Sequence, residues 1–316
     1  MKVLITGAAG NLGSSLARYL LDGPNELRLL IHRRALPDDV ASSPNVSVYR
    51  ANLEDSGSLA DLCRDIDCVV HFAGVLFAPR PAKFLPRTNV EYVRNLVTAA
   101  LAAGVRKFVL ISFPHVEGES SPDHPAIGRL DGKPTSVHAQ TRLAAERYLF
   151  TACEGREMVP VVLRAGMIYG HGLRLSEAAR WLLRHRLLSV WNQPTWIHLL
   201  ALPDFLRCVA SAIEGKSVSG IYNLGDDRPL TLQECLDTVA THWGVPKPWR
   251  CPRWLFYAAG WCCEAFATVF GTAAPLTRDV IRIGMASCVA DTSRMKKELA
   301  AELAFPSLRE GLTLLS

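Results

Sequence analysis

The 316-residue chain lacks the features of several protein classes. Its nine cysteines form no Cys-x-x-Cys pair and have no histidine or cysteine at metal-ligand spacing, which argues against a zinc site and a disulfide framework. Lys and Arg exceed Asp and Glu by only 35 to 30 and are scattered, unlike the basic surface of a nucleic-acid-binding protein. A nucleophile elbow and a glycosidase-like carboxylate pair are also missing. We therefore expect no metal site and no nucleic-acid partner.

Long apolar runs and a secretory leader are missing as well. An apolar, strand-like run begins almost at Met1, which together with the cysteine usage predicts a cytoplasmic protein. One apolar stretch, residues 254–270, has Glu264 as its only charged residue but is too short and interrupted to span a bilayer comfortably. Three interpretations are open: a helix that caps an apolar substrate pocket, a plain core helix, or, least favoured, a patch in peripheral contact with a membrane.

The first thirteen residues, MKVLITGAAGNLG, predict a strand, a tight glycine turn and a helix. Apolar residues recur at helical spacing over residues 11–21. Gly7 permits the turn, Gly10 lets the backbone approach a pyrophosphate, and Gly13 lets the helix pack closely on the strand. The pattern indicates a dinucleotide site, with an ordinary turn between a strand and a helix as the alternative.

The end of the second apolar run, residues 27–31, bears on the choice of cofactor. It leads into His32, Arg33 and Arg34, where a dinucleotide-binding fold contacts the adenosine ribose. An acidic residue there would accept hydrogen bonds from a 2′-hydroxyl, whereas arginine suits a 2′-phosphate. The sequence therefore favours NADP, with NAD as the alternative if these residues form only a solvated loop.

Regular alternation of strands and helices continues along the chain. A helical segment spans residues 89–103, and strands are expected at residues 3–5, 27–31, 46–50, 68–74 and 107–112. This alternation predicts an α/β protein with a Rossmann-type, doubly wound parallel sheet, whose ligand lies at the carboxyl ends of the strands.

Five blocks, TGAAGNLG, HFAG, TNVEYVRNLVTAALAAGVRKFVLIS, VVLRAGMIYG and IYNLGDDRPLTLQE, carry a family resemblance over essentially the whole chain. In this order and spacing the chain resembles an extended short-chain dehydrogenase/reductase of the NAD-dependent epimerase/dehydratase type. Its C-terminal third is similar to the 3β-hydroxysteroid-dehydrogenase-like branch. The resemblance implies a nucleotide-binding domain over residues 1–169, with return segments near 195–225, and a smaller, mostly helical substrate lobe over 170–316.

The resemblance also implies a set of cofactor-binding residues. They are Gly7, Gly10, Asn11, Leu12 and Gly13 at the pyrophosphate, Asn52 and Leu53 beside the adenine, Phe72, Ala73, Gly74 and Val75 along the cofactor, and Ser112, Arg164, Ala165, Met167 and Ile168 flanking the nicotinamide half. Two of these positions depart from the family: Asn52 stands where Asp is common, and Ala165 where Pro is usual.

The family's catalytic Tyr-x-x-x-Lys pair is missing from this chain. The matching block, SVHAQTRLAAE, places His138 at the tyrosine position and Arg142 at the lysine position. The third partner, a Ser or Thr after the fifth strand, is either Ser112 or is replaced by Phe113. Four residues apart, His138 and Arg142 share a helix face, so the spacing of the missing pair is kept.

The chemical properties of His138 and Arg142 indicate what each could do in place of the tyrosine and the lysine. An imidazole with an ordinary pKa of about 6.5 can exchange a proton at neutral pH. Arg142 cannot shuttle protons, but as a fixed cation it could hold the ribose hydroxyls, and it would lower the pKa of His138 and favour the base form. We expect an NADP-dependent oxidoreductase that uses His138, Arg142 and Ser112. The alternatives are a nucleotide-sugar epimerase or dehydratase, and an NADP-binding regulatory protein with a retired site.

The lobe segments at residues 170–194 and 231–316 are apolar and aromatic, which favours a mostly apolar substrate held by shape. Four arginines of the first segment, which could instead hold a nucleotide diphosphate or form a solvated helix face, are Arg174, Arg180, Arg184 and Arg186. By the family resemblance, helices at 89–103 and 143–153 predict a homodimer.

Overall fold

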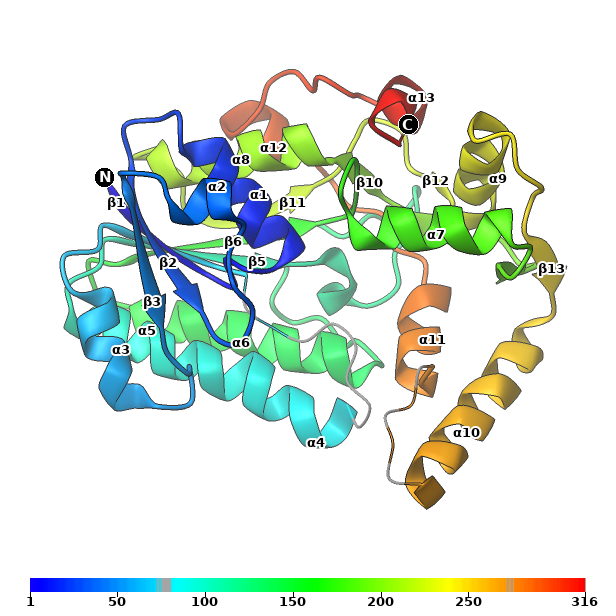
Figure 1. Ribbon diagram of the computed structural model, residues 1–316, viewed down its shortest axis with the longest axis horizontal. Coiled ribbons are helices and arrows are strands. Elements are labelled where there is room, and N and C mark those ends of the chain that lie inside the picture. The colour runs from blue at the N-terminus through cyan, green and yellow to red at the C-terminus, as the bar shows by residue number, and fades with distance from the viewer. Residues whose placement is uncertain (73, 75–80, 271, 273, 275, 316) are drawn as a thin grey trace.

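The computed structural model describes the chain except residues 73, 75–80, 271, 273, 275 and 316. Its centre is a seven-stranded parallel sheet in the order β11-β6-β5-β4-β1-β2-β3 (Figure 1). The strands are β1 (Lys2–Thr6), β2 (Glu26–Ile31), β3 (Val46–Arg50), β4 (Cys68–His71), β5 (Lys107–Ser112), β6 (Val159–Ala165) and β11 (Gly220–Leu224).

The central strands are apolar because helices cover both faces of the sheet. Ile5 of β1 lies opposite Leu29 of β2 and Val70 of β4, and all three side chains are fully buried. A parallel sheet buried in this way has nearly continuous apolar strands. The predicted doubly wound Rossmann sheet is confirmed, although β4 ends at His71, three residues before the expected end.

Two helical layers enclose the sheet (Figure 1). One core contains Leu16, Phe205 and Met295, and the other contains Val97 and Leu149. The first layer is built from α1 (Asn11–Leu20), α8 (Leu202–Glu214) and α12 (Ser293–Glu298), with the short α2 (Asp38–Ala41) beside it; the second is built from α3 (Ser56–Cys63), α5 (Tyr92–Ala102) and α6 (Val137–Cys153). Met295 lies within the predicted lobe range of 170–316, yet it packs in the core of the nucleotide-binding half.

The remaining elements form the ends of the nucleotide-binding half and the lobe. The helices are α4 (Pro81–Leu85), α7 (Arg174–Arg184), α9 (Leu232–His242), α10 (Arg253–Phe270), α11 (Arg278–Met285) and α13 (Leu308–Gly311), with a π-helix at Pro86–Glu91 and 3-10 turns at Pro114–Glu117 and Leu312–Leu315. The strands, which pair as β10-β7, β12-β9 and β13-β8, are β7 (Met167–Tyr169), β8 (Ser189–Trp191), β9 (Trp196–Ile197), β10 (Leu199–Ala201), β12 (Leu230–Thr231) and β13 (Trp249–Cys251).

The helices expected at a subunit interface are α5 and α6. Their apolar side chains, including Val93, Leu96 and Leu149, are buried within the chain's own core. The exposed positions between them include Arg94 and Arg147. The homodimer stays a prediction.

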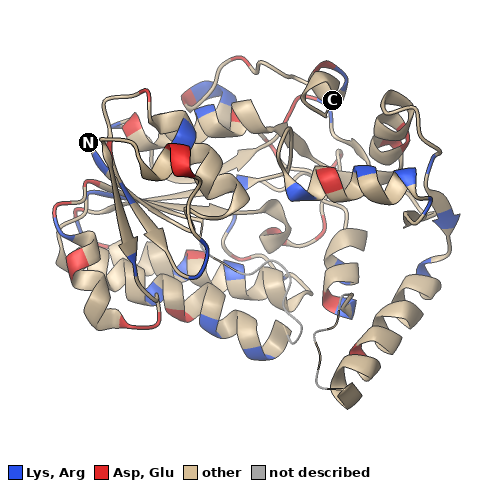
Figure 2. Ribbon diagram, in the orientation of Figure 1, with Lys and Arg blue, Asp and Glu red and all other residues tan. Residues whose placement is uncertain are grey.

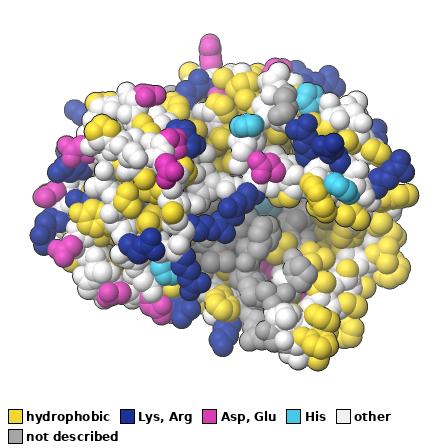
Figure 3. All heavy atoms as spheres, in the orientation of Figure 1, with side chains coloured by type: hydrophobic (Ala, Val, Ile, Leu, Met, Phe, Trp, Pro, Cys, Tyr) yellow, Lys and Arg dark blue, Asp and Glu magenta, His cyan; other side chains and the backbone are white. Residues whose placement is uncertain are grey.

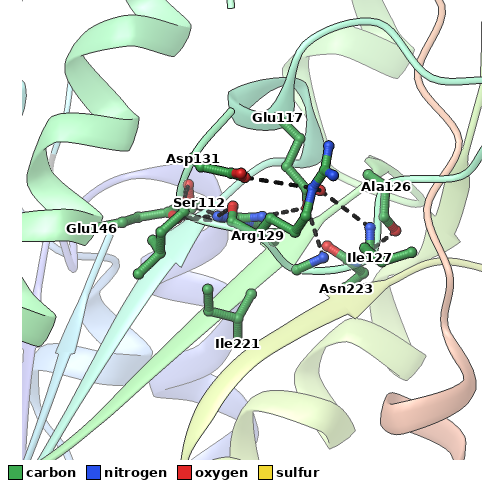
Figure 4. A network of polar contacts seen from close by, with 12 residues as sticks. Ser112, Glu117, Ala126, Ile127, Arg129, Asp131, Glu146, Ile221 and Asn223 are labelled. Atoms are coloured by element: carbon green, nitrogen blue, oxygen red, sulfur yellow. Dashed lines mark hydrogen bonds and ion pairs between the residues drawn. The ribbon is translucent and has the colours of Figure 1, made fainter. Parts of the chain in front are cut away.

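A buried ion-pair network joins the carboxyl ends of β5 and β6 to α6 (Figure 4). The Arg164 side chain is fully buried; its Nη2 donates to Glu146 Oε2 at 2.5 Å and its Nη1 to Glu117 Oε1 at 2.5 Å. Ser112 Oγ donates to Glu146 Oε1 at 2.5 Å. Arg164 Nη2 also donates to the Arg129 carbonyl at 2.8 Å. One guanidinium is thus ion-paired with two buried carboxylates.

The same network reaches the C-terminal part of the chain. Glu117 accepts hydrogen bonds from the backbone N–H groups of Ile127 and Gly128 (Figure 4). Ala126, the preceding residue, accepts a hydrogen bond from Asn223 Nδ2 on β11 at 2.9 Å, and its N–H donates to the Val289 carbonyl. The loop at 126–131 is therefore held between the main sheet and the segment that follows α11.

We expect Arg164→Leu to lower the free energy of unfolding by about 3–5 kcal/mol, because it removes the buried cation that is hydrogen-bonded to both Glu117 and Glu146. The matched control is Arg129→Leu, which removes an exposed guanidinium that lies 3.8 Å from the same Glu117 and should cost less than about 1 kcal/mol. Urea unfolding of both variants at pH 7 measures the difference. Equal losses would show that the network does not stabilise the fold.

Candidate active site

The first glycine turn has the geometry of a phosphate-binding loop. Gly7 has a φ of 72°, a conformation that side-chain-bearing residues rarely adopt, and its carbonyl accepts a hydrogen bond from Gly10 N at 2.8 Å. A Cβ on Gly13 would lie 2.3 Å from the Gly7 carbonyl oxygen, so this close approach requires glycine. Asn11 and Leu12 open α1, whose first N–H groups have no partner within the helix and whose positive dipole end favours an anion. These residues fit a dinucleotide pyrophosphate.

The end of β2 carries exposed basic side chains. His32, Arg33 and Arg34 follow β2 directly and are exposed, and Arg50 Nη1 donates to the His32 carbonyl at 3.3 Å. The nearest following acid pair is Asp38-Asp39, of which Asp39 accepts a hydrogen bond from Arg18 at 2.6 Å. Asp39 is therefore paired with Arg18 and does not supply a carboxylate to the ribose. The exposed basic side chains suit a 2′-phosphate.

The other predicted residues of the adenine half lie along the neighbouring strands. Asn52 bonds within its own turn, accepting from the Glu54 N–H, and Leu53 is buried in the core beneath α3 and α5. Phe72 packs edge-on against Phe205 at a ring-centroid distance of 6.2 Å, so it contributes to the core under α8. Ala73 and Val75 lie outside the described residues.

The helix α6 presents the two residues that stand in place of the family's tyrosine and lysine. Ser136 caps its N-terminus by accepting from Ala139 N, and Asp279 of α11 accepts from the backbone N–H of Val137 at 2.9 Å. These caps satisfy N–H groups that a helix leaves free and fix the first turn, which contains His138. Position 138 is therefore held by both the nucleotide-binding half and the lobe.

His138 lies in an apolar and aromatic environment. Its side chain is buried, its ring centroid is 5.1 Å from that of Phe113, and Phe113 is 5.3 Å from His115. Its Nδ1 has no hydrogen-bond partner among the described residues. Burial, with smaller contributions from Arg142 and His115, lowers the pKa of His138 to about 3. The imidazole is therefore neutral at pH 7 and can accept a proton, but it is a weaker base than an exposed histidine.

Arg142 connects α6 to the carboxyl edge of the sheet. Its Nη1 donates to the Ile111 carbonyl at 3.4 Å, and a Cβ on Gly74 would lie 2.3 Å from its Nη2. The guanidinium thus packs on the glycine that follows β4. Burial lowers the pKa of Arg142 to about 10, opposed by the charge of Glu146, so the side chain remains a cation at neutral pH.

Ser112 does not have the environment expected of a catalytic hydroxyl. It is only 6% exposed, and its proton is committed to the Glu146 carboxylate. The Arg164 side chain likewise belongs to the ion-pair network and does not flank an open site. Phe113, one residue after Ser112, is the side chain that lies against His138, so we omit Ser112 from the proposed catalytic set.

The remaining predicted residues are at the ends of β6 and β7. Ala165 is buried, Ile168 is partly buried against the first core, and Met167 is exposed. Gly166 between them approaches the His198 carbonyl so closely that a Cβ would lie 2.3 Å from that oxygen. The small residues Ala165 and Gly166 lie where the chain passes from β6 to β7.

His71 and His198 have structural environments. His71 at the end of β4 is fully buried, and its Nδ1 is 2.8 Å from Thr6 Oγ1. His198 accepts the Ala290 N–H at Nδ1 and has Nε2 2.7 Å from the Asp226 carbonyl. This pairing is satisfied by the neutral ring, and burial lowers the pKa of His198.

Asn89 is a buried polar residue next to α6 that the sequence analysis did not single out. It is buried in the π-helical turn before α5, where its Nδ2 donates to Thr141 Oγ1 on α6 at 3.1 Å. Its Oδ1 has no hydrogen-bond partner in the described part of the chain. Irregular turns of this kind occur often at functional sites, and an amide on the inward face of an otherwise apolar helix was the available signal.

In the lobe, the arginines of α7 and most side chains of α10 are exposed at the surface. Arg174, Arg180 and Arg184 are exposed along α7, as is Arg186 after it, which is the solvated-face alternative. Only Gly260 and Ala267 of α10 are buried, so the interpretation of this stretch as a plain core helix is wrong. In the described residues, no three His, Cys, Asp or Glu side chains gather as a metal ion would require.

The chain is similar to several known proteins. The 2-alkyl-3-oxoalkanoate reductase of Stenotrophomonas maltophilia is 27% identical over 78% of this chain and 77% of its own. A 3-beta-hydroxysteroid dehydrogenase of Mycolicibacterium neoaurum is 23% identical over 78% of this chain and 71% of its own. The structure of Thermotoga maritima UDP-glucose 4-epimerase with UDP-glucose has a TM-score of 0.79 and 19% identity, covering 100% of this chain and 97% of that one.

The structural likeness shows the fold, and the sequence comparison shows the family. Residues 3–225, which run from β1 through the glycine turn and α6 to the last strand of the main sheet, match the profile of the NAD dependent epimerase/dehydratase family. The chain therefore belongs to the NAD dependent epimerase/dehydratase family.

Proposed function

We propose that this protein is an NADP-dependent oxidoreductase that interconverts an alcohol and a ketone in a mostly apolar substrate. The observation that carries the proposal is the placement of Arg142, four residues after His138, directly on Gly74 at the carboxyl edge of the sheet. The helix that normally carries catalytic residues in this family thus still aims a cation at the cofactor edge. An apolar substrate agrees with the reductase and the steroid dehydrogenase among the relatives.

The cofactor would be held by residues at three strand ends. The N–H groups at the start of α1 would hold the pyrophosphate, Arg33 and Arg34 the 2′-phosphate, and Arg142 the ribose next to the nicotinamide. When bound, the nicotinamide supplies the acceptor or donor of a hydride.

The chain's own contribution is to the substrate oxygen. During alcohol oxidation, the His138 imidazole takes the hydroxyl proton while the carbon loses its hydrogen with the electron pair to the nicotinamide, and a ketone remains. Arg142 stabilises the negative charge that develops on that oxygen, because a fixed cation in a buried site acts with little screening. In the reverse direction the same imidazole returns the proton.

Two other functions have observations in their favour. A nucleotide-sugar epimerase agrees with the fold shared with the Thermotoga enzyme. A cofactor-binding regulatory protein agrees with the burial of His138 and its low pKa, which make it a weak base. Net change in cofactor absorbance with an alcohol or ketone supports the oxidoreductase, and sugar epimerisation without such a change supports the epimerase. Tight binding without turnover supports the regulator.

The cofactor preference is tested by the double variant Arg33→Ala/Arg34→Ala. Removing two charge-assisted partners of a phosphate should weaken NADPH binding by about 10- to 100-fold and leave NADH binding nearly unchanged. Fluorescence titration with both cofactors measures this. Arg64→Ala, at the amino edge of the sheet, is the control. Equal affinity of the double variant and the control for NADPH would contradict the 2′-phosphate assignment.

Turnover is tested with His138→Ala on alcohols and ketones that include sugars, steroids and terpenoids. We expect the variant to lose at least about 100-fold in kcat/KM, the contribution typical of a proton-transfer group, while cofactor binding is kept. His124→Ala changes an exposed histidine and should leave the rate unchanged. Wild-type turnover that survives in His138→Ala would exclude this role for His138.

The pH dependence of alcohol oxidation is a separate prediction. Because the pKa of His138 is about 3, the base form stays populated as the pH falls, and kcat/KM should remain level from pH 8 to about pH 5. A histidine of ordinary pKa would lose half of its base form at about pH 6.5. Initial rates across this range, with circular dichroism to monitor folding, make the measurement. A midpoint near 6.5 would show that His138 is hydrated and titrates normally.

A further inference from the structure

The outward side of α10 carries mostly apolar side chains. Trp254, Trp261 and Val269 are 65%, 61% and 77% exposed. Phe266 and Phe270 are also exposed, and their ring centroids lie 4.3 Å apart. A helix on the surface of a folded protein normally turns charged residues to water. Between residues 254 and 277 only Glu264 is charged, so α10 has the reverse pattern.

The inner side of α10 already uses its packing contacts. Gly260 lies so close to α11 that a Cβ would be 2.6 Å from Ile281 Cδ1, and Phe256 packs edge-on against Trp191 at 5.6 Å. Glu264 is bound to Arg278 at 2.7 Å. The charge of the single acid is thus neutralised by Arg278, and Trp254, Trp261, Phe266 and Phe270 remain exposed to solvent.

The apolar surface continues beyond α10. Leu187 and Trp249 are each 61% exposed, on segments joined by the β8-β13 pairing, and Trp249 Nε1 donates to the Arg186 carbonyl at 3.3 Å. Figure 3 shows hydrophobic side chains gathered over this side of the molecule. We call Leu187, Trp249 and the exposed side chains of α10 the apolar face.

Positive charge is concentrated beside the apolar face. Residues 171–190 and 243–286 together hold nine Lys or Arg and three Asp or Glu, an excess of six, whereas the whole chain has a net charge of +5. Figure 2 shows this charge along α7 and around β13. Asp237 on α9 pairs with Lys247 and Arg250 and offsets one of these charges.

We propose that the apolar face binds the surface of an anionic lipid bilayer, with α10 lying in the plane of the interface. Trp and Tyr side chains favour the boundary between headgroups and acyl chains, and basic side chains attract anionic headgroups. Among the described residues, no helix is long and apolar enough to cross a membrane, which leaves binding to one leaflet.

Charge favours a bilayer over a second copy of the chain as the occupant. A symmetric pair formed through the apolar face would bring two identical arginine-rich borders together, and like charges at an interface are unfavourable. Anionic headgroups neutralise the same border. The proposal does not depend on the enzymatic activity, because it concerns the outward side of α10, whereas Asp279 on the neighbouring α11 faces α6.

The test is flotation of the full chain with vesicles of phosphatidylcholine alone and with added phosphatidylglycerol. We expect binding to the anionic vesicles, weaker binding at high salt, and quenching of tryptophan fluorescence by brominated lipid. The variant Trp254→Glu/Trp261→Glu should bind at least about tenfold more weakly. Tyr19→Glu, which adds one negative charge at an exposed aromatic residue on α1 away from the apolar face, should bind as the wild type does.

Three results would overturn the proposal. The first is no binding of the wild type to anionic vesicles at low salt. The second is binding that Trp254→Glu/Trp261→Glu leaves unchanged. The third is a wild-type dimer in sedimentation that the same variant converts to a monomer, which would assign the apolar face to a second copy. Circular dichroism of each variant shows that the fold is kept, and NADPH titration shows independently whether the nucleotide site is intact.

Discussion

The placement of the candidate site depends on the fully buried Arg164 and its two carboxylates. A lone carboxylate at the position of Glu146 would be strongly unfavourable, so β6 and α6 must meet where the guanidinium can reach it. That contact fixes the rotation of α6 and hence the side on which His138 and Arg142 appear. It also commits the Ser112 hydroxyl, and the side chain after β5 that approaches His138 is Phe113.

The site combines a neutral base with a retained cation. His138 and Arg142 lie one helical turn apart on α6. Burial lowers both pKa values but has different consequences for their charge, because an imidazole has an ordinary pKa near neutrality and a guanidinium has one far above it. Burial therefore empties the charged form of His138 but leaves Arg142 positive, with pKa values of about 3 and about 10. His138 is therefore the group that can accept a proton, and Arg142 is the group that can stabilise a negative charge.

The lobe and the nucleotide-binding half are coupled through short polar contacts. Asp279 caps α6, Ala126 bridges β11 to the strand-like segment near Val289, and Met295 packs into the main core. A ligand or surface bound at the lobe is thus only one helix away from the first turn of α6. By contrast, α10 attaches through Gly260, Phe256 and the Glu264–Arg278 ion pair, which leaves its other large aromatic side chains, Trp254, Trp261, Phe266 and Phe270, exposed.

The sequence by itself determined the sheet, the glycine turn and the departure from Tyr-x-x-x-Lys. Each depends on local patterns: apolar runs form buried strands, Gly7 and Gly13 meet steric demands within thirteen residues, and the spacing of His138 and Arg142 fixes a shared helix face. Only the tertiary structure decided that Ser112 and Arg164 belong to an ion pair, that Asn89 faces α6, and that α10 turns its aromatic side outward. Those outcomes depend on which residues from distant parts of the chain come into contact in the folded protein. Such contacts produce no periodic pattern in the sequence from which they could be predicted.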